Sequence, residues 1–281
     1  MNRFAALCAC AALWSCASVT PAPAAPAAEP VELKGEWTQG HLIFGKAAPG
    51  STVSFNGQPV RVSPEGVFII GLDRDEPAKA LLVVAHPGVA TFRREFDVAP
   101  RAYDIQRLDG LPPDQVTPPP AAQLRIAIDY EQVRAARMRD SDRDDFARGF
   151  TWPLTGRISG VYGSQRILNG QPKQPHYGVD VAAPIGAKVR APASGVVSLA
   201  VPDMYYTGGT LMIDHGHGLS STLMHLNKLL VKQGDEVKQG QVVAESGASG
   251  RVTGPHLDWR VSWFGSRVDP QLLVGPMPDK K

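Results

Sequence analysis

The sequence predicts a mainly β protein that is built from short strands and contains one helical segment. Glycine (28) and proline (25) are abundant among the 281 residues, which favours frequent turns over long helices. Short apolar runs such as residues 52–55 and 81–84 lie between these turns, and no helix-length apolar period follows Phe150. Residues 121–148 contain neither Gly nor Pro and are rich in Ala, Arg, Asp and Glu, which predicts a charged helix.

The overall composition is that of a globular protein with room for two domains. Apolar residues make up 43% of the chain, and 29 basic residues nearly balance 27 acidic ones. Nucleic-acid binding would need a concentrated basic face, which this balance does not supply. We therefore expect no nucleic-acid partner.

The first 30 residues predict an export signal followed by a tether. One positive charge precedes an apolar run at residues 4–13, which is too short to cross a bilayer because a crossing helix needs about 20 residues. Residues 13–16 (LWSC) resemble a bacterial lipobox and predict acylation of Cys16; cleavage after Ala24 without a lipid is the alternative. Residues 17–30 are an Ala/Pro tether. We expect an exported, periplasmic protein anchored in the outer membrane through Cys16.

The cysteines limit the chemistry of the rest of the chain. Cys8, Cys10 and Cys16 all lie inside the predicted export segment. The remainder therefore offers neither a disulfide nor a thiolate, so a metal there must be bound by histidine and carboxylate side chains.

Three regions are predicted after the tether. Residues 31–100 show short strands and turns, with a hairpin signal at Asn56-Gly57, and predict a small β-sandwich. Residues 101–149 predict a linker and the charged helix, and residues 150–275 predict a second β domain. His41 and His86 stand alone in the first β region, so we interpret both as structural or surface residues.

Five of the seven histidines fall between residues 176 and 256. His176 and Asp180 are four residues apart, and His256 and Asp258 are two apart, so on strands each pair would share one face. A catalytic zinc ion takes three protein ligands from His and carboxylates and leaves a fourth position for water. Each pair could bind such an ion, but taken separately each is equally compatible with a structural role.

The order of these motifs along the chain is similar to that in a known protein family. His-x-x-x-Asp (residues 176–180), His-Gly-x-Gly (215–218) followed by His225-Leu226, and Gly-Pro-His-Leu (254–257) stand in a glycine-rich β context. Together they resemble the lysostaphin-type (LytM-like) zinc metalloendopeptidases over residues 150–275. The resemblance implies a barrel-sandwich (duplicated hybrid) domain. Residues 237–247 would also suit a lipoyl-type carrier, but the lone exposed hairpin lysine of such carriers is missing.

The resemblance also implies roles for individual residues. His176 and Asp180 match the first two zinc ligands, and His225 and His256 match the two catalytic histidines that do not bind zinc. Asp258 stands where the family has its third ligand, a histidine. A second carboxylate would make the zinc cluster formally neutral, which weakens its pull on a bound water; alternatively, Asp258 has destroyed the site. We expect Asp258 to complete the site, with one zinc ion per chain.

The function implied is that of a peptidoglycan hydrolase. We expect a zinc-dependent endopeptidase that cleaves peptide cross-links or stem peptides of the bacterial cell wall, in particular the bond from D-alanine to diaminopimelate. One of His225 and His256 would help to deprotonate a zinc-activated water, and the other would stabilise the oxyanion or protonate the leaving amine.

Some features leave room for other roles. The alternative to the hydrolase is an inactive relative that binds and activates a cell-wall amidase. Peptidoglycan peptides are the expected partner, and cell-wall amidase or divisome proteins are further candidates. We expect His215 to organise a hairpin and His217 to be a surface residue of a turn.

Overall fold

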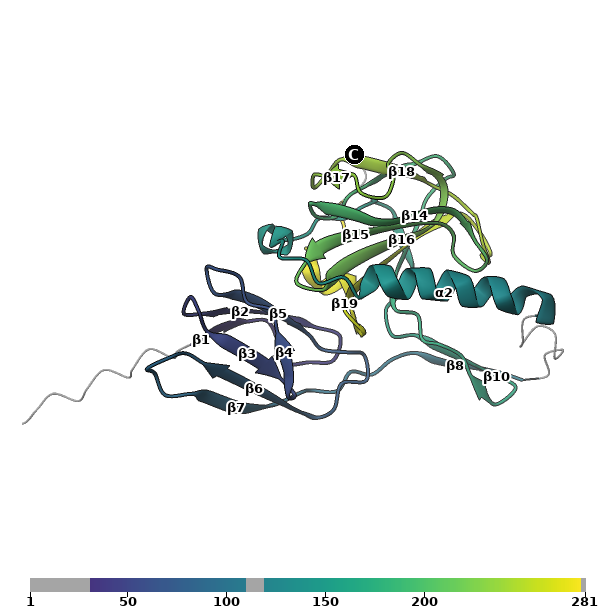
Figure 1. Cartoon of the computed structure of the whole chain (residues 1–281). Helices are drawn as coiled ribbons and strands as arrows, with labels where there is room; N and C mark the ends of the chain where they lie inside the picture. The colour runs from purple at the N-terminus through teal and green to yellow at the C-terminus, as the bar shows by residue number, and fades with distance from the viewer. Residues whose placement is uncertain (1–30, 110–118, 279–281) are drawn as a thin grey trace, which may run out of the picture.

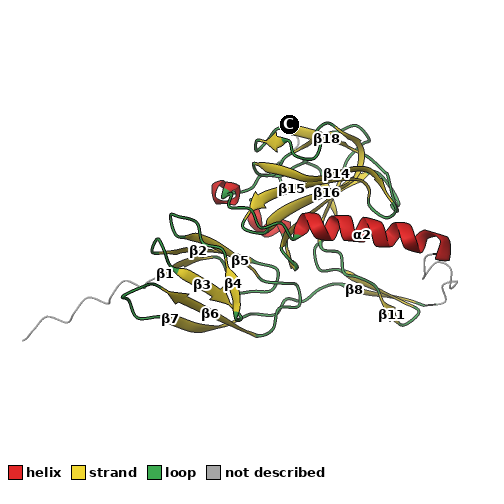
Figure 2. Ribbon diagram, in the orientation of Figure 1, coloured by secondary structure: helices red, strands yellow, loops and turns green. Residues whose placement is uncertain are grey.

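The computed structural model describes residues 31–109 and 119–278 (Figure 1). Strands dominate it and a single α-helix is present in this part of the chain, so the predicted mainly β fold is confirmed (Figure 2). The predicted export segment, including Cys16, lies outside the described residues. None of the described helices is long and apolar enough to cross a membrane.

Two small sheets form the N-terminal β region. One has the order β1-β2-β5 and the other β4-β3-β6-β7. Asn56 and Gly57 connect β3 to β4, and both have positive φ angles (47° and 79°), as the predicted hairpin turn requires. The apolar inner faces of both sheets belong to one core. The strands are β1 (Val31–Lys34), β2 (Leu42–Ala47), β3 (Thr52–Phe55), β4 (Gln58–Val60), β5 (Val67–Gly71), β6 (Lys79–Ala85) and β7 (Phe92–Asp97).

The region between the two β domains contains more strand and less helix than predicted. Strand β8 (Ile105–Leu108) pairs in parallel with β10 (Gln165–Leu168), which also pairs with β11 (Gln171–Pro172). A short 3-10 turn, η1 (Pro120–Ala122), leads into helix α2 (Gln123–Arg137). The predicted helix over residues 121–148 therefore ends early, because the run Asp140-Ser141-Asp142 that follows consists of weak helix formers. A second 3-10 turn, η2 (Asp145–Arg148), covers the rest of that stretch.

The C-terminal region is built on one large antiparallel sheet with the order β17-β14-β15-β16-β19-β12-β9. Strand β18 pairs with β13 and β16, and β20 pairs with β19. Helix α2 lies against β14 and β15 (Figure 1), where Ala136 packs with Leu199, Met204 and Met212. The elements are β9 (Arg157–Gly160), β12 (Gly178–Ala182), β13 (Lys188–Arg190), β14 (Gly195–Met204), β15 (Gly208–Gly216), β16 (Leu219–Leu229), β17 (Glu236–Val237), β18 (Val242–Ser246), β19 (His256–Trp263), β20 (Ser266–Val268) and η3 (Pro270–Leu273).

Candidate metal centre

Strands β12 and β19 bring the predicted metal ligands together. Asp180 on β12 lies directly opposite Asp258 on β19 in the antiparallel register. The Nε2 atom of His176 lies 3.1 Å from Asp180 Oδ1 and 3.3 Å from Asp258 Oδ2. One ligand atom from each of the three residues lies within 4.8 Å of the others, so the three can converge on a single ion.

His176 reaches this cluster from a loop, not from a strand. We predicted that His176 and Asp180 share a strand face, but β12 begins only at Gly178, so that reason was wrong. The backbone N–H of His176 donates to the Ser164 carbonyl (2.8 Å), and its carbonyl accepts from Gly163 (2.7 Å). Its Nδ1 atom donates to the Val161 carbonyl at 3.1 Å, which turns Nε2 toward the two carboxylates. Metal-binding histidines are commonly oriented in this way.

The two predicted catalytic histidines lie side by side next to the cluster. The ring centroids of His225 and His256 are 4.8 Å apart. Each ring donates its Nδ1 proton to a backbone carbonyl, of Ser249 (2.9 Å) for His225 and of Gly254 (2.8 Å) for His256. A carbonyl can only accept, so a neutral ring carries its proton on Nδ1 and leaves Nε2 free to accept another.

The positions of these two rings relative to the cluster differ. His256 Nε2 lies 3.7 Å from Asp180 Oδ1, at the edge of the ligand cluster. Burial lowers the pKa of His225, which keeps its ring neutral at neutral pH. A neutral histidine beside a metal site can take up a proton, as the predicted catalytic role requires.

The electrostatics of the cluster are dominated by its two carboxylates and one arginine. Burial alone would raise the pKa of the Asp258 carboxyl, but the adjacent Arg260 guanidinium and His176 hold it well below its usual range. Burial would likewise lower the pKa of His176, yet hydrogen bonds to Asp180 and Asp258 raise it to about 10. These contacts favour a protonated His176 ring between the two carboxylates when no metal is bound.

The residues present fit a divalent metal ion. Asp180 Oδ1 is buried and faces His176 Nε2 at 3.1 Å, within the group of three ligand atoms. One nitrogen and two carboxylate oxygens form a donor set that zinc accepts. The side chains of His176, Asp180 and His256 keep about a fifth of their surface exposed (19%, 22% and 17%), so a substrate can reach the site.

The two histidines on the neighbouring turn have structural positions. His215 is fully buried, with Nδ1 bonded to the Ser194 carbonyl (2.7 Å) and Nε2 to the Ser221 hydroxyl (2.9 Å), which fits its predicted role in the hairpin. His217 was predicted at the surface, and this was wrong. It is only 2% exposed because its ring packs on Phe146, with 5.1 Å between centroids.

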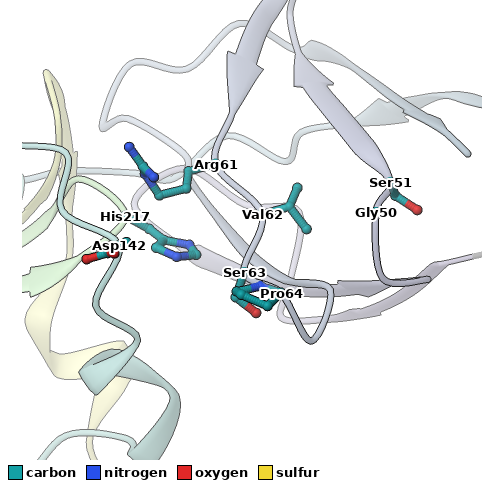
Figure 3. Close-up of a pocket in the computed structure, with 8 residues that line it drawn as sticks. All are labelled: Gly50, Ser51, Arg61, Val62, Ser63, Pro64, Asp142 and His217. Atoms are coloured by element: carbon teal, nitrogen blue, oxygen red, sulfur yellow. The ribbon is translucent and has the colours of Figure 1, made fainter.

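A pocket elsewhere in the molecule does not contain the metal cluster. It lies at the junction of the two β regions, where Arg61 and Pro64 face Asp142 and His217 (Figure 3). None of the predicted metal or catalytic residues lines it. The chemistry expected of the chain therefore belongs to the β12–β19 cluster and not to this pocket.

One residue that contacts the cluster was missed by the sequence analysis. Arg260 lies two residues after Asp258 on the same face of β19, and its Nη2 atom is 2.7 Å from Asp258 Oδ2. The signal was present as Asp-x-Arg between the apolar residues Leu257, Trp259 and Val261. Side chains two residues apart on a strand lie on the same face, so the two charges can pair. A buried charge in that position calls for a partner.

Comparison with known proteins identifies the same region. Residues 174–270 match the model of peptidase family M23. The chain is 46% identical over 117 residues to the peptidoglycan DD-endopeptidase ShyB of Vibrio cholerae, covering 42% of this chain and 24% of ShyB. It is 36% identical over 142 residues to ShyA of the same organism, covering 49% of this chain and 33% of ShyA. It thus spans about a quarter to a third of the length of these relatives.

A solved structure resembles a larger part of the chain. The Pseudomonas aeruginosa structure assigned to peptidase M23 covers 85% of this chain and 95% of its own, at 29% identity and a TM-score of 0.64. The likeness therefore extends beyond the matched segment to the N-terminal sheets. The motifs of residues 176–258, their convergence in the structure and the family match agree with one another. The match to peptidase family M23 thus covers residues 174–270, the segment that holds the metal cluster.

Proposed function

We propose that this chain is a zinc-dependent endopeptidase that cleaves peptide cross-links or stem peptides of bacterial peptidoglycan. The observation that carries the proposal is the meeting of His176, Asp180 and Asp258 within 4.8 Å, next to the paired rings of His225 and His256. The names of the Vibrio cholerae relatives, both peptidoglycan DD-endopeptidases, support the substrate class. They also support a bond between two D-centres, such as the one from D-alanine to diaminopimelate.

The residues of the cluster divide into metal ligands and proton carriers. His176, Asp180 and Asp258 would hold the zinc, which when bound supplies a Lewis acid that polarises a peptide carbonyl and activates water. His225 presents a neutral Nε2 atom and is placed to accept a proton. His256 presents its Nε2 atom beside the ligand cluster and is placed to stabilise negative charge on the carbonyl oxygen or to return the proton to the leaving amine.

Metal analysis combined with cell-wall digestion tests this proposal. Protein purified without a chelator should contain about one zinc per chain, and it should release muropeptides from purified peptidoglycan until a chelator removes the metal. A folded protein with neither zinc nor cleavage would refute the hydrolase. That outcome would favour the regulator of a cell-wall amidase, for which the replacement of the family's third histidine by Asp258 is the supporting observation.

We further propose that the protein acts in the periplasm, held at the outer membrane through Cys16. The lipobox-like residues 13–16 and the Ala/Pro tether support this location. A Cys16→Ser variant should move from the membrane fraction to the soluble fraction. An unchanged distribution between the two fractions would refute the lipid anchor.

A further inference from the structure

We propose that Arg260 is a positioning residue for the metal: it orients Asp258 and offsets its charge, so that Asp258 and Arg260 together replace the single histidine expected at that position. This inference rests on the proposed zinc site. Asp258 is negatively charged, whereas the resemblance implies a neutral histidine as the third zinc ligand.

The first support is the geometry of the pair. Arg260 Nε lies 3.1 Å from both carboxylate oxygens of Asp258, and Nη2 lies 2.7 Å from Oδ2. Oδ2 is also the oxygen that lies 3.3 Å from His176 Nε2. The guanidinium therefore holds the carboxylate in one orientation, with Oδ2 turned toward the other ligand atoms. Partners of this kind, bonded to a ligand and not to the metal, fix the orientation of the ligand and tune the site.

The second support is burial. The Asp258 side chain is only 3% exposed, and that of Arg260 is 25% exposed. A buried carboxylate without a partner is costly, and a charged partner with matching hydrogen bonds reduces that cost. Among the described residues, the ion pair that Arg260 makes is with Asp258.

The third support is the space made for the pair on the neighbouring strand. Gly178 on β12 lies opposite Arg260 in the register. A Cβ atom at Gly178 would lie 2.5 Å from the Trp259 carbonyl oxygen of β19, and 2.6 Å from both Asp258 Oδ1 and Arg260 Cγ. Glycine at this position therefore leaves room for the two side chains to lie flat against β12.

The charge balance explains why the arginine is needed. Zinc with one neutral histidine and two aspartates is formally neutral, and the Arg260 guanidinium brings the group to one positive charge. Zinc with two histidines and one aspartate also carries one positive charge. Asp258 and Arg260 together therefore give the same net charge as the family's ligand set. The attraction of the site for a bound water, which a second carboxylate alone would weaken, is restored.

A double-mutant cycle on zinc affinity tests the pair. The full chain and its variants compete with a chromogenic chelator for zinc, and the absorption of the cobalt(II)-substituted proteins reports on the ligands. Arg260→Gln should weaken zinc binding by about 10–100-fold, and Arg260→Lys should recover part of the loss. Asp258→His alone should also weaken binding, although histidine is the expected family ligand, because the Arg260 guanidinium then lies beside the zinc without the carboxylate that offsets its charge.

The decisive variant combines both changes. Asp258→His with Arg260→Gln removes the unpaired charge and should bind zinc more tightly than Asp258→His alone. Arg260→Gln thus has opposite effects in the two backgrounds, which a general role in folding would not produce. An effect of the same sign in both backgrounds would overturn the inference.

Arg267→Gln is the matched control. Arg267 lies on β20, where its guanidinium bonds to the Ser262 hydroxyl (3.0 Å) and lies over the Tyr177 ring, and no ion pair connects it to Asp258 among the described residues. Its loss should leave zinc affinity within about threefold of the wild type. A folded wild-type protein without zinc would overturn the proposed function together with this inference, whereas a same-sign effect in zinc-binding variants would overturn the inference alone.

Discussion

At the scale of single residues, His225 has an unusual backbone. Its φ angle is +62°, a region that residues with a side chain seldom occupy. The backbone N–H donates to the Thr207 carbonyl and the ring donates to the Ser249 carbonyl, both at 2.9 Å. Two loops therefore hold the ring in place next to His256. Strain of this kind persists where the surroundings over-determine it, and it clusters at active sites.

We expect His225→Ala to abolish peptidoglycan cleavage and to leave zinc content unchanged. His225 is not among the clustered ligand residues, and a positioned acid or base contributes about 10²–10⁴-fold to the rate. Muropeptide release and zinc content are measured on the same preparation. His86→Ala, in the distant N-terminal sheets, serves as the control. Loss of zinc from His225→Ala would show that His225 supports the metal instead.

His215 makes stability depend on pH. Burial lowers its pKa, and its Nε2 atom faces the Ser221 hydroxyl at 2.9 Å, so the folded protein favours the neutral ring. A folded pKa below the unfolded value of about 6.5 means that stability is complete above that pH and is lost as pH falls through the folded pKa. The loss approaches about 1.4 kcal/mol per pH unit for one proton. Urea unfolding between pH 8 and 5 should show a shallower fall for His215→Gln, and equal slopes would contradict this.

At the scale of elements, the pairing of β12 with β19 places two like charges opposite each other. Asp180 and Asp258 face one another in the register, an arrangement that costs stability unless a cation lies between them. Zinc at a hundred times its dissociation constant should stabilise the wild type by about 2.7 kcal/mol. Asp180→Asn removes a ligand, so its melting temperature should not respond to zinc. A zinc-dependent shift in this variant would exclude Asp180 as a ligand.

These elements also show what the sequence could predict. His256 and Asp258 share a face of β19 because strand side chains alternate, and this was predictable from their spacing. The position of His176 was not predictable. It depends on hydrogen bonds to the carbonyls of Ser164 and Val161, which lie 12 and 15 residues earlier in the chain and come close only in the folded protein. The sequence analysis also missed the end of α2 at Arg137. It relied on the spacing of apolar residues and gave too little weight to the low helix propensity of the residues that follow.

At the scale of the whole molecule, the two β regions share one hydrophobic core. Buried residues of β5 and of β19 and β20 belong to the same cluster, and the Phe55 ring meets the edge of Trp263 at 6.3 Å between centroids. Polar contacts reinforce the junction: Arg74 donates to the Gly163 carbonyl at 2.9 Å, and Arg101 pairs with Asp269 at 2.9 Å. The segment from Val161 to His176, which orients the His176 ring, is therefore braced by the N-terminal region through Arg74.

This shared core predicts that the two regions unfold together. Gly71 ends β5 directly against β19 and β20, and a Cβ atom there would lie 2.6 Å from Trp263 Cβ and 3.2 Å from Val268 Cγ2. Gly71→Ala should force β5 away from β19 and β20, and this overpacking should lower the free energy of unfolding by about 1–3 kcal/mol. Calorimetry of the wild type should show one unfolding transition. The variant should unfold at a lower temperature or in two separate transitions.

Gly275→Ala provides the matched control for this experiment, because a Cβ atom at Gly275 would meet nothing within 4 Å. It should melt like the wild type. Zinc affinity gives a second readout, since a loosened junction frees the loop that holds His176 and should weaken binding in Gly71→Ala alone. A single unshifted transition in Gly71→Ala would mean that the two surfaces separate at no cost, and that the N-terminal sheets do not brace the metal site.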